Sequence, residues 1–204
     1  MIAIIDYGVG NLFSLCSSLK FIGINAVITG EKAVIDRCDK MILPGVGAFA
    51  DAADKLHFEG LGEFVAREAE SGKPLLGVCL GMQLLFEKSF EFGEHRGLGL
   101  LKGAVMPIKP RIPGDYKIPH IGWNALRFPH GERSALFRYI NEGDHVYFVH
   151  SYHAELCEEY IIATAEYGLD LTAAVAKDHI YGTQFHPEKS GETGLNILRA
   201  FAEI

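Results

Sequence analysis

Short apolar segments alternate with segments of helical pattern through the first half of the chain. Helical spacing is found over residues 12–22, 32–37, 50–56 and 61–71. Residues 2–5 form a fully apolar run, and further strand candidates lie at residues 26–29, 40–43 and directly after 73. Fully apolar runs of this length are typical of strands buried on both faces. The alternation therefore predicts an α/β fold, with a central, mostly parallel sheet flanked by helices.

The pattern changes after Phe90. Residues 97–129 combine glycine, proline and short strand-like pieces without a helical pattern, and strands are predicted at 146–149, 160–165, 171–176 and 180–185. Turn sequences at residues 166–168 and 177–179 indicate hairpins, so we expect an antiparallel-rich second half that ends in a helix over 193–202. With no repeat or linker, residues 1–204 are expected to form a single domain.

Charge and cysteine usage exclude several classes of function. The net charge is -7, from 19 basic and 26 acidic residues, which argues against a nucleic-acid partner. No apolar run approaches the roughly 20 residues that span a bilayer, and the N-terminus lacks a basic signal-peptide region. The four cysteines form no Cys-x-x-Cys pair, which argues against a zinc ribbon or a disulfide framework. We therefore expect a cytoplasmic protein that binds neither nucleic acid nor membrane.

One cysteine lies where the pattern switches from strand to helix. In residues 77–81, Gly-Val-Cys-Leu-Gly, a glycine stands two positions to each side of Cys79, which is the layout of a nucleophile elbow. The glycines leave room for a tight turn and for a substrate beside the backbone, and a helix N-terminus favours the thiolate. Free cysteines are also frequent in protein cores. Taken alone, the stretch is compatible with a reactive or an inert cysteine.

A histidine and a glutamate follow the last predicted strand, in His186-Pro187-Glu188. Pro187 favours an extended conformation at His186, and residues two apart in an extended segment point to the same face. The carboxylate would then orient the imidazole, as in the base half of a catalytic triad. Two ordinary polar residues at a strand end would have the same sequence. Together with Cys79, the pair predicts a Cys-His-Glu set at the carboxyl ends of two strands.

Several segments together resemble a known family. Residues 77–83 and 186–188 are similar to the paired signatures of the class I glutamine amidotransferases, and residues 44–47, Pro-Gly-Val-Gly, resemble their oxyanion loop. Residues 6–12, 44–49, 120–124 and 186–190 resemble, more narrowly, the glutaminase subunits of imidazole glycerol phosphate synthases. The resemblance covers the whole chain. It implies the class I glutamine amidotransferase-like fold and hydrolysis of glutamine to glutamate and ammonia, without a metal or organic cofactor.

The resemblance and the chemistry of the side chains together suggest roles for individual residues. Cys79 would attack the amide carbon of glutamine, His186 would move the proton and Glu188 would hold the histidine tautomer. Two backbone N–H groups are expected to stabilise the oxyanion that forms on the glutamine side chain. One belongs to Leu80, and the other belongs to Val46 or Gly47. The side chain of Gln83, on the same helix face as Cys79, and the segment at Ser151 and Tyr152 are expected to bind the substrate.

The resemblance also implies a partner. A (β/α)8-barrel cyclase would take the ammonia and form imidazole glycerol phosphate and aminoimidazole carboxamide ribotide in histidine biosynthesis, in a heterodimer. Asn11, Trp123 and Lys189 are expected at that interface. The sequence alone is equally compatible with Trp123 in the core and with Lys189 as an ordinary surface residue. Gly45 and Gly47 would permit a peptide flip that partner docking reverses.

Three alternatives to this function remain open. The glutaminase could serve amidation of a cell-surface sugar, the scaffold could be a non-catalytic binding module, or the chain could be a stand-alone hydrolase of γ-glutamyl compounds. His145, His150 and His153 lie close in sequence but lack ligands at metal-binding spacing, so structural or surface roles are expected for them.

Overall fold

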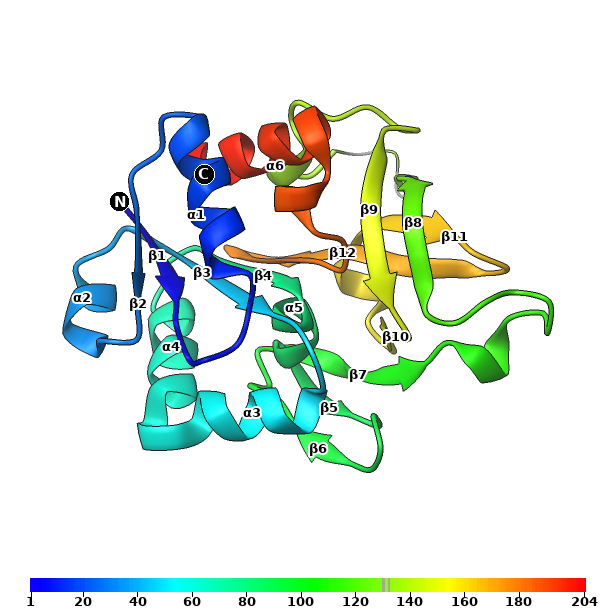
Figure 1. Cartoon of the computed structure of the whole chain (residues 1–204), viewed down its shortest axis with the longest axis horizontal. Helices are drawn as coiled ribbons and strands as arrows, with labels where there is room; N and C mark the ends of the chain where they lie inside the picture. Colours follow the sequence, from blue (N-terminus) through cyan, green and yellow to red (C-terminus); the bar gives the residue numbers. More distant parts are fainter. Residues whose placement is uncertain (130, 132) are drawn as a thin grey trace.

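A seven-stranded sheet forms the centre of the computed structural model, which describes residues 1–129, 131 and 133–204 (Figure 1). The strand order is β11-β12-β13-β4-β3-β1-β2. Five of these strands run parallel: β1 (Ile2–Ile5), β2 (Ala26–Thr29), β3 (Lys40–Gly45), β4 (Leu75–Cys79) and β13 (Ile180–Thr183). The antiparallel strands β12 (Asp170–Lys177) and β11 (Ile161–Glu166) extend the sheet through the two predicted hairpins. The mostly parallel sheet of the α/β prediction is confirmed.

Helices cover both faces of this sheet (Figure 1). They are α1 (Leu12–Phe21), α2 (Lys32–Asp36), α3 (Phe49–His57), α4 (Leu61–Glu70), α5 (Leu80–Leu84) and α6 (Gly191–Glu203). Alternate residues of one strand enter different cores, because side chains alternate across a sheet. Ala3 and Ile5 of β1 pack with the α3–α4 side, whereas Ile2 and Ile4 pack with the α1–α6 side. Burial on both faces explains the uninterrupted apolar runs.

Two smaller sheets complete the second half. A four-stranded sheet has the order β10-β7-β5-β6, and a two-stranded sheet pairs β8 with β9. Their bounds are β5 (Phe86–Ser89), β6 (His95–Arg96), β7 (Leu101–Pro107), β8 (His120–Ala125), β9 (His145–His150) and β10 (Tyr152–Glu155). Single 3-10 turns are η1 (Phe58–Gly60), η2 (Lys109–Arg111), η3 (Ala135–Phe137), η4 (Glu158–Tyr160) and η5 (Pro187–Lys189). The second half is thus rich in antiparallel pairs, as predicted.

Several element boundaries differ from those predicted from the sequence. The helix after Cys79 is only five residues long, because the continuous apolar run 84–86 turns into β5, which pairs with β7. The last strand ends at Thr183 rather than residue 185, and the closing helix begins at Gly191 rather than 193. Beyond Thr183 the backbone N–H of His186 bonds to the carbonyl oxygen of Tyr147 in β9, outside the central sheet. Among the described residues no helix is long and apolar enough to cross a membrane.

Candidate active site

Cys79 ends β4 and directly precedes α5 in a strained conformation. Its backbone angles are φ 54° and ψ -112°, and a non-glycine residue in such a region costs about 1–3 kcal/mol, a cost found mostly at functional sites. The predicted strand-to-helix elbow is therefore present. Its side chain reaches the wall of a cavity of about 400 Å³ although the residue is only 7% exposed.

The two glycines of the elbow allow close backbone packing. A Cβ at Gly81 would lie 1.8 Å from the carbonyl oxygen of Leu43, and a Cβ at Gly77 would lie 2.7 Å from the carbonyl oxygen of Gly81. The space that both glycines leave is occupied by the backbone of β3 and α5. The tight turn expected from the sequence is thus explained by contacts within the protein rather than by an open substrate channel.

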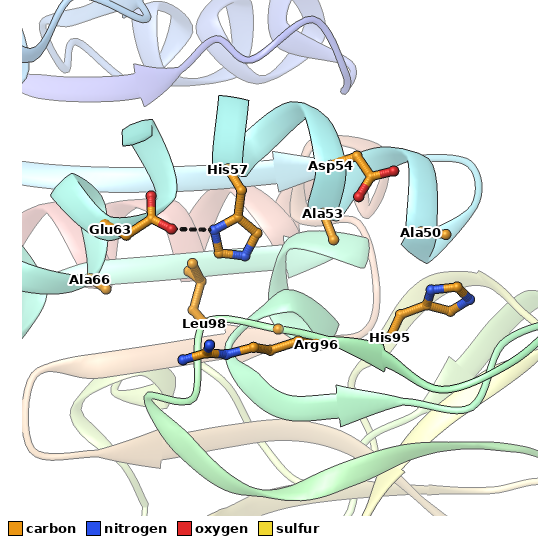
Figure 2. A pocket seen from close by; sticks show the side chains of 10 residues that line it. Ala50, Ala53, Asp54, His57, Glu63, Ala66, His95, Arg96 and Leu98 are labelled. Carbon is orange, nitrogen blue, oxygen red and sulfur yellow. Dashed lines mark hydrogen bonds and ion pairs between the residues drawn. The ribbon is translucent and has the colours of Figure 1, made fainter. Parts of the chain in front are cut away.

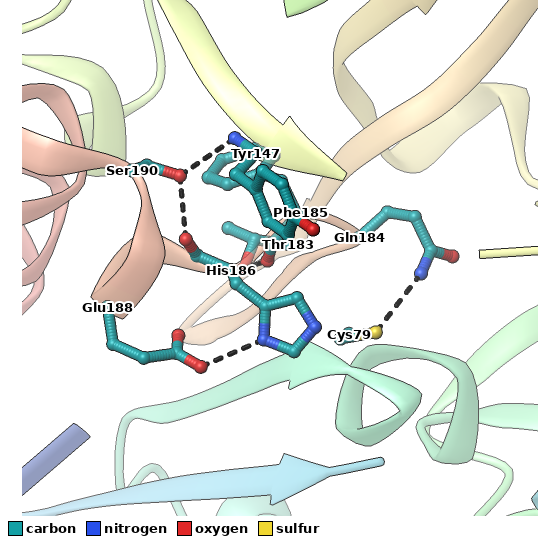
Figure 3. A network of polar contacts seen from close by, with 8 residues as sticks. All are labelled: Cys79, Tyr147, Thr183, Gln184, Phe185, His186, Glu188 and Ser190. Atoms are coloured by element: carbon teal, nitrogen blue, oxygen red, sulfur yellow. Dashed lines mark hydrogen bonds and ion pairs between the residues drawn. The ribbon is translucent and has the colours of Figure 1, made fainter. Parts of the chain in front are cut away.

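His186 and Glu188 form the predicted pair, with His186 Nδ1 and Glu188 Oε1 2.8 Å apart and both side chains 3% exposed (Figure 3). The predicted reason for the contact is wrong. The strand has already ended, and Glu188 lies in the 3-10 turn η5 rather than two residues along an extended segment. Ser190 holds this turn, because its hydroxyl donates to the His186 carbonyl oxygen at 2.6 Å and accepts the Tyr147 N–H at 2.9 Å.

The imidazole of His186 lies beside Cys79 (Figure 3). Strand β13 pairs with β4, with Thr183 opposite Val78, so the residues that follow the two strands meet at one edge of the sheet. Burial by itself lowers the pKa of His186, but hydrogen bonds and charge from Cys79 and Glu188 outweigh it and raise the pKa to about 9. A histidine of this kind stabilises a neighbouring thiolate as an imidazolium and can later donate its proton. The three predicted triad residues therefore lie together.

The predicted oxyanion residues Val46, Gly47 and Leu80 line the same cavity as Cys79. Val46 is 41% exposed, and Gly47 has a φ of +94°, which favours glycine. Leu80 is the first residue of α5, where backbone N–H groups lack helical partners. The three residues are thus at the site, while their role as oxyanion donors stays a prediction.

A comparison with known proteins identifies the family of this site. The model of the family "Glutamine amidotransferase class-I" matches residues 3–204. The chain belongs to the class I glutamine amidotransferase family.

Curated relatives in this family are similar over their full length. The chain is 48% identical over 205 residues to "Imidazole glycerol phosphate synthase subunit HisH" of Caldanaerobacter subterraneus subsp. tengcongensis, covering 100% of this chain and 98% of the relative. The protein of the same name from Wolinella succinogenes is 48% identical over 206 residues, with 100% of both chains covered. The resemblance that the sequence motifs indicate is confirmed.

Solved structures bear out the amidotransferase fold. A structure described as "glutamine amidotransferase" superposes with a TM-score of 0.75 at 20% identity, covering 100% of this chain and 99% of the other. The structure of PurLQS from Thermotoga maritima gives a TM-score of 0.74 at 19% identity, with 99% and 97% covered. At these identities the likeness concerns the fold alone, and it confirms the predicted class I amidotransferase-like architecture.

The predicted substrate-binding residues of this amidotransferase also meet at the cavity. Gln83, Ser151 and Tyr152 all line it. Gln83 Nε2 donates to the Tyr152 carbonyl oxygen at 3.2 Å and to Gln184 Oε1 at 3.0 Å, so the protein itself uses both of its amide hydrogens. Their contact with glutamine stays a prediction.

The sequence analysis missed Glu91 and Gln184. Glu91 lines the cavity and its Oε2 accepts the backbone N–H of Phe49, the first residue of α3, at 2.5 Å. Gln184 is fully buried, with Nε2 3.8 Å from Cys79 Sγ. Glu91 follows β5, whose existence the apolar pattern did not reveal. One feature of the sequence could have indicated Gln184: it is a polar amide at the end of a buried strand, two residues before His186, and a buried amide needs a hydrogen-bond partner.

The predicted interface residues are not in the core. Trp123 on β8 is 55% exposed, which excludes its alternative as a core residue, and Lys189 lines the cavity mouth. Both lie beside Tyr147: the Lys189 ammonium is 6.0 Å from the Tyr147 ring and the Trp123 ring is 6.2 Å from it. Asn11 is half-buried and directly precedes α1. An interface role for the three stays a prediction.

A second cavity, of about 450 Å³, lies between α3, α4 and β6 (Figure 2). His57 Nδ1 and Glu63 Oε1 lie 2.7 Å apart in its wall. Its lining contains no member of the Cys79 triad, so we place the active site in the other cavity. Within the described ranges, no group of three or more histidine, cysteine or acidic side chains is arranged to hold a metal ion.

Proposed function

We propose that this chain is the glutaminase subunit of an imidazole glycerol phosphate synthase, which hydrolyses glutamine to glutamate and ammonia. The observation that carries the proposal is His186, held between Cys79 and Glu188 in a chain that matches relatives of that name at 48% identity over its full length. These relatives favour the histidine pathway over amidation of a cell-surface sugar. An intact triad also speaks against a non-catalytic binding module.

The first half of the reaction transfers the glutamyl group to Cys79. The thiolate sulfur attacks the side-chain amide carbon, a C–S bond forms and the carbonyl oxygen becomes an oxyanion. The N–H of Leu80 and an N–H of Val46 or Gly47 stabilise that charge, and losing one such donor typically costs about a hundredfold or more in rate. The His186 imidazolium then protonates the leaving nitrogen, the C–N bond breaks and ammonia departs.

The second half of the reaction releases glutamate. Water attacks the thioester while neutral His186 takes its proton, and the C–S bond breaks to regenerate the thiolate beside the imidazolium. Glu188 keeps His186 Nδ1 protonated throughout, so that the other ring nitrogen faces the reacting atoms. No step needs a metal or an organic cofactor.

The cavity wall suggests how glutamine is oriented. Glu91 supplies a carboxylate for the α-ammonium group, and charge-assisted hydrogen bonds of this kind are about twice as strong as neutral ones. Ser151, between β9 and β10, and Tyr152, the first residue of β10, border the same cavity, and we place the α-carboxylate beside them. The side-chain amide then extends toward Cys79.

We infer that ammonia passes directly to a (β/α)8-barrel cyclase in a heterodimer. The relatives are named as subunits, which supports an assembly. Free ammonia is largely protonated in neutral water, so a closed passage preserves the nucleophilic form. Exposed Trp123, Lys189 at the cavity mouth and Asn11 before α1 are the contact residues we assign to this interface.

A glutaminase assay with a candidate cyclase tests the proposal. Ammonia release from glutamine should be low for the chain alone, rise when the cyclase and its ligand are added, and disappear in Cys79→Ala. Cys16→Ala is the matched control, because Cys16 lies on α1 away from the cavity and its removal should leave turnover unchanged. Ammonia release that survives in Cys79→Ala would refute the mechanism, and full activity without a cyclase would refute the partner-dependent flip of the oxyanion loop.

A further inference from the structure

Gln184 makes polar contacts at both ends of its side-chain amide. The residue has no exposed surface, its Nε2 donates to Cys79 Sγ at 3.8 Å, and its Oε1 accepts from Gln83 Nε2 at 3.0 Å. Figure 3 shows the amide of Gln184 and the ring of His186 reaching Cys79 from different directions. The sulfur therefore has a second N–H donor, which the triad chemistry does not include.

The hydrogen bonds continue from Gln83 to the sheet formed by β8 and β9. The carbonyl oxygen of Tyr152 accepts from Gln83 Nε2 at 3.2 Å and is 2.8 Å from His150 Nδ1. His150 Nε2 is 3.0 Å from His120 Nδ1, and His120 Nε2 is 3.4 Å from the Asn124 amide nitrogen. His120, His150 and Gln83 are all buried.

Only one arrangement of protons satisfies these contacts. A carbonyl oxygen can only accept, so His150 Nδ1 must carry the proton that it donates to Tyr152. Burial lowers the pKa of His150 to about 3 and that of His120 to about 4, which keeps both rings neutral near pH 7. His150 Nε2 is then an acceptor, His120 Nδ1 donates to it, and His120 Nε2 accepts from the Asn124 amide.

The orientation of Asn124 is itself fixed by the backbone. Its amide nitrogen donates to the Glu166 carbonyl oxygen at 2.8 Å, and its amide oxygen accepts the Ala125 N–H at 2.8 Å. The donors therefore run in one direction from Asn124 to the Tyr152 carbonyl oxygen. Because this oxygen can only accept, it holds the amide nitrogen of Gln83, which also donates to Gln184 Oε1 and so leaves Gln184 Nε2 to donate to the sulfur. This matters at Gln184, because an amide turned by half a rotation would present its oxygen to the thiolate and repel it.

We propose that Gln184 is a positioning residue for the Cys79 thiolate, and that the hydrogen-bonded series Asn124, His120, His150, Tyr152 and Gln83 fixes its amide with the N–H toward the sulfur. The proposal rests on the proposed function in one respect, the use of Cys79 as the nucleophile. It assigns the buried histidines of β8 and β9 a part in organising the active site. Networks of this kind hold a unique arrangement only while every member is paired.

The experiment measures the reactivity of Cys79 directly. The full chain is treated with iodoacetamide between pH 6 and 10, and alkylation of the Cys79 peptide is followed by mass spectrometry. Gln184→Met keeps the length of the side chain without a donor, and should slow alkylation at pH 7 by about 3- to 10-fold and move the pH profile upward. Circular dichroism reports whether each variant is folded.

A remote variant tests the series itself. His120→Phe keeps an aromatic ring between Phe148 and Tyr167, which stack on His120, but removes the donor to His150. Alkylation of Cys79 should slow by about 2- to 3-fold. His145→Asn is the matched control, since this histidine of β9 is exposed, and it should alkylate at the wild-type rate.

Two results would overturn the proposal. A folded Gln184→Met chain with the wild-type alkylation profile would remove the role of Gln184. A folded His120→Phe chain with that profile would remove the series behind it, and this variant decides alone where Gln184→Met does not fold. Alkylation needs neither glutamine nor a cyclase, so a wild-type chain without glutaminase activity would refute the proposed function and leave this measurement valid.

Discussion

The hydroxyl group of Tyr7 donates a hydrogen bond of 2.7 Å to the carbonyl oxygen of Pro44. Tyr7 follows β1 and is buried, and Pro44 opens the Pro-Gly-Val-Gly segment at the end of β3. A Cβ at Gly45 would lie 2.9 Å from the same hydroxyl. Tyr7 therefore fixes the start of the segment, whereas Val46 and Gly47, which follow, line the cavity.

We expect Tyr7→Phe to impair this segment. The variant leaves the Pro44 carbonyl oxygen without its donor, which should lower the free energy of unfolding by about 0.5–1.5 kcal/mol. It should also lower kcat of the glutaminase by about tenfold, with less change in KM, because an oxyanion donor acts in the transition state. Urea unfolding and steady-state kinetics measure the two effects.

Tyr139→Phe provides the control for the loss of a tyrosine hydroxyl. Tyr139 is 45% exposed and donates to Glu203 Oε2 at 2.7 Å on the surface. Its loss should change stability by less than about 0.5 kcal/mol and leave turnover unchanged. Equal kinetics for the two variants would contradict a role of Tyr7 in the loop.

Replacing Glu188 tests the orientation of the base. Glu188→Gln removes the carboxylate that helps to raise the pKa of His186 to about 9, so this pKa should fall toward its ordinary value of 6.5. Turnover should drop by about 10- to 1000-fold. Histidine NMR titration and kcat measure these changes. Glu192→Gln, an exposed change in the first turn of α6, should be silent, and a wild-type rate in Glu188→Gln would exclude the triad.

Gly81→Ala should damage the fold at the elbow. The new Cβ would lie 1.8 Å from the Leu43 carbonyl oxygen, a backbone atom that cannot move without disturbing β3. We expect a loss of at least about 3 kcal/mol in the free energy of unfolding, as for other overpacked cores. Gly114→Ala is the control, because its Cβ would have nothing within 4 Å and should change the melting temperature little. Similar melting temperatures would show that the elbow tolerates repacking.

Stability should fall on both sides of neutral pH. Burial lowers the pKa of His150 to about 3 and of His120 and His153 to about 4, so these histidines contribute stability above pH 6.5 that is lost as the pH falls below it. The raised pKa of His186, about 9, acts in the opposite sense and loses its contribution as the pH rises from 6.5 through 9.

Urea unfolding at a series of pH values measures this dependence. Each buried histidine steepens the acid side by at most about 1.4 kcal/mol per pH unit. His120→Phe should give a shallower decline between pH 6.5 and 4 than the wild type. A stability that stays constant from pH 7 to 5 would mean that these rings are not neutral in the folded chain.

Trp123→Ala should weaken the complex with the cyclase. An exposed aromatic anchor at an interface typically contributes about 2 kcal/mol or more, which corresponds to a rise in Kd of roughly 30-fold. Phe21→Ala is the matched control: Phe21 is 81% exposed, but it ends α1, whereas the expected contact residue Asn11 precedes that helix. Titration calorimetry with the cyclase compares them. Equal affinities would remove Trp123 from the interface.

The central sheet could be predicted from the sequence because its signals are local. Residues 2–5 and 41–43 are apolar at every position, as expected for strands covered on both faces. The smaller sheets could be predicted only in part: the strand expected at 146–149 is β9, but β5 is defined by its pairing with β7 and its sequence resembles a continuation of the preceding helix. Tertiary contacts decided the element there.

The candidate site divides in the same way. Cys79, His186 and Glu188 were found from residue type and spacing, although the contact between the last two arises from the turn η5 rather than from an extended strand. Glu91 and Gln184 were missed, because Glu91 reaches the cavity and Gln184 reaches Cys79 from a loop or strand end whose position depends on distant segments. Residues within a recognisable local motif could be predicted from the sequence, whereas residues outside such motifs could not.

The sheet order also determines when this chemistry becomes available during synthesis. β13 lies between β4 and β12, although β4 leaves the ribosome about a hundred residues earlier at a rate of roughly 5–20 residues per second. Until β13 inserts, Cys79 has no base beside it, and its edge of the parallel sheet lacks a neighbour. A chain released before residue 180 would therefore carry the cysteine without its histidine and glutamate.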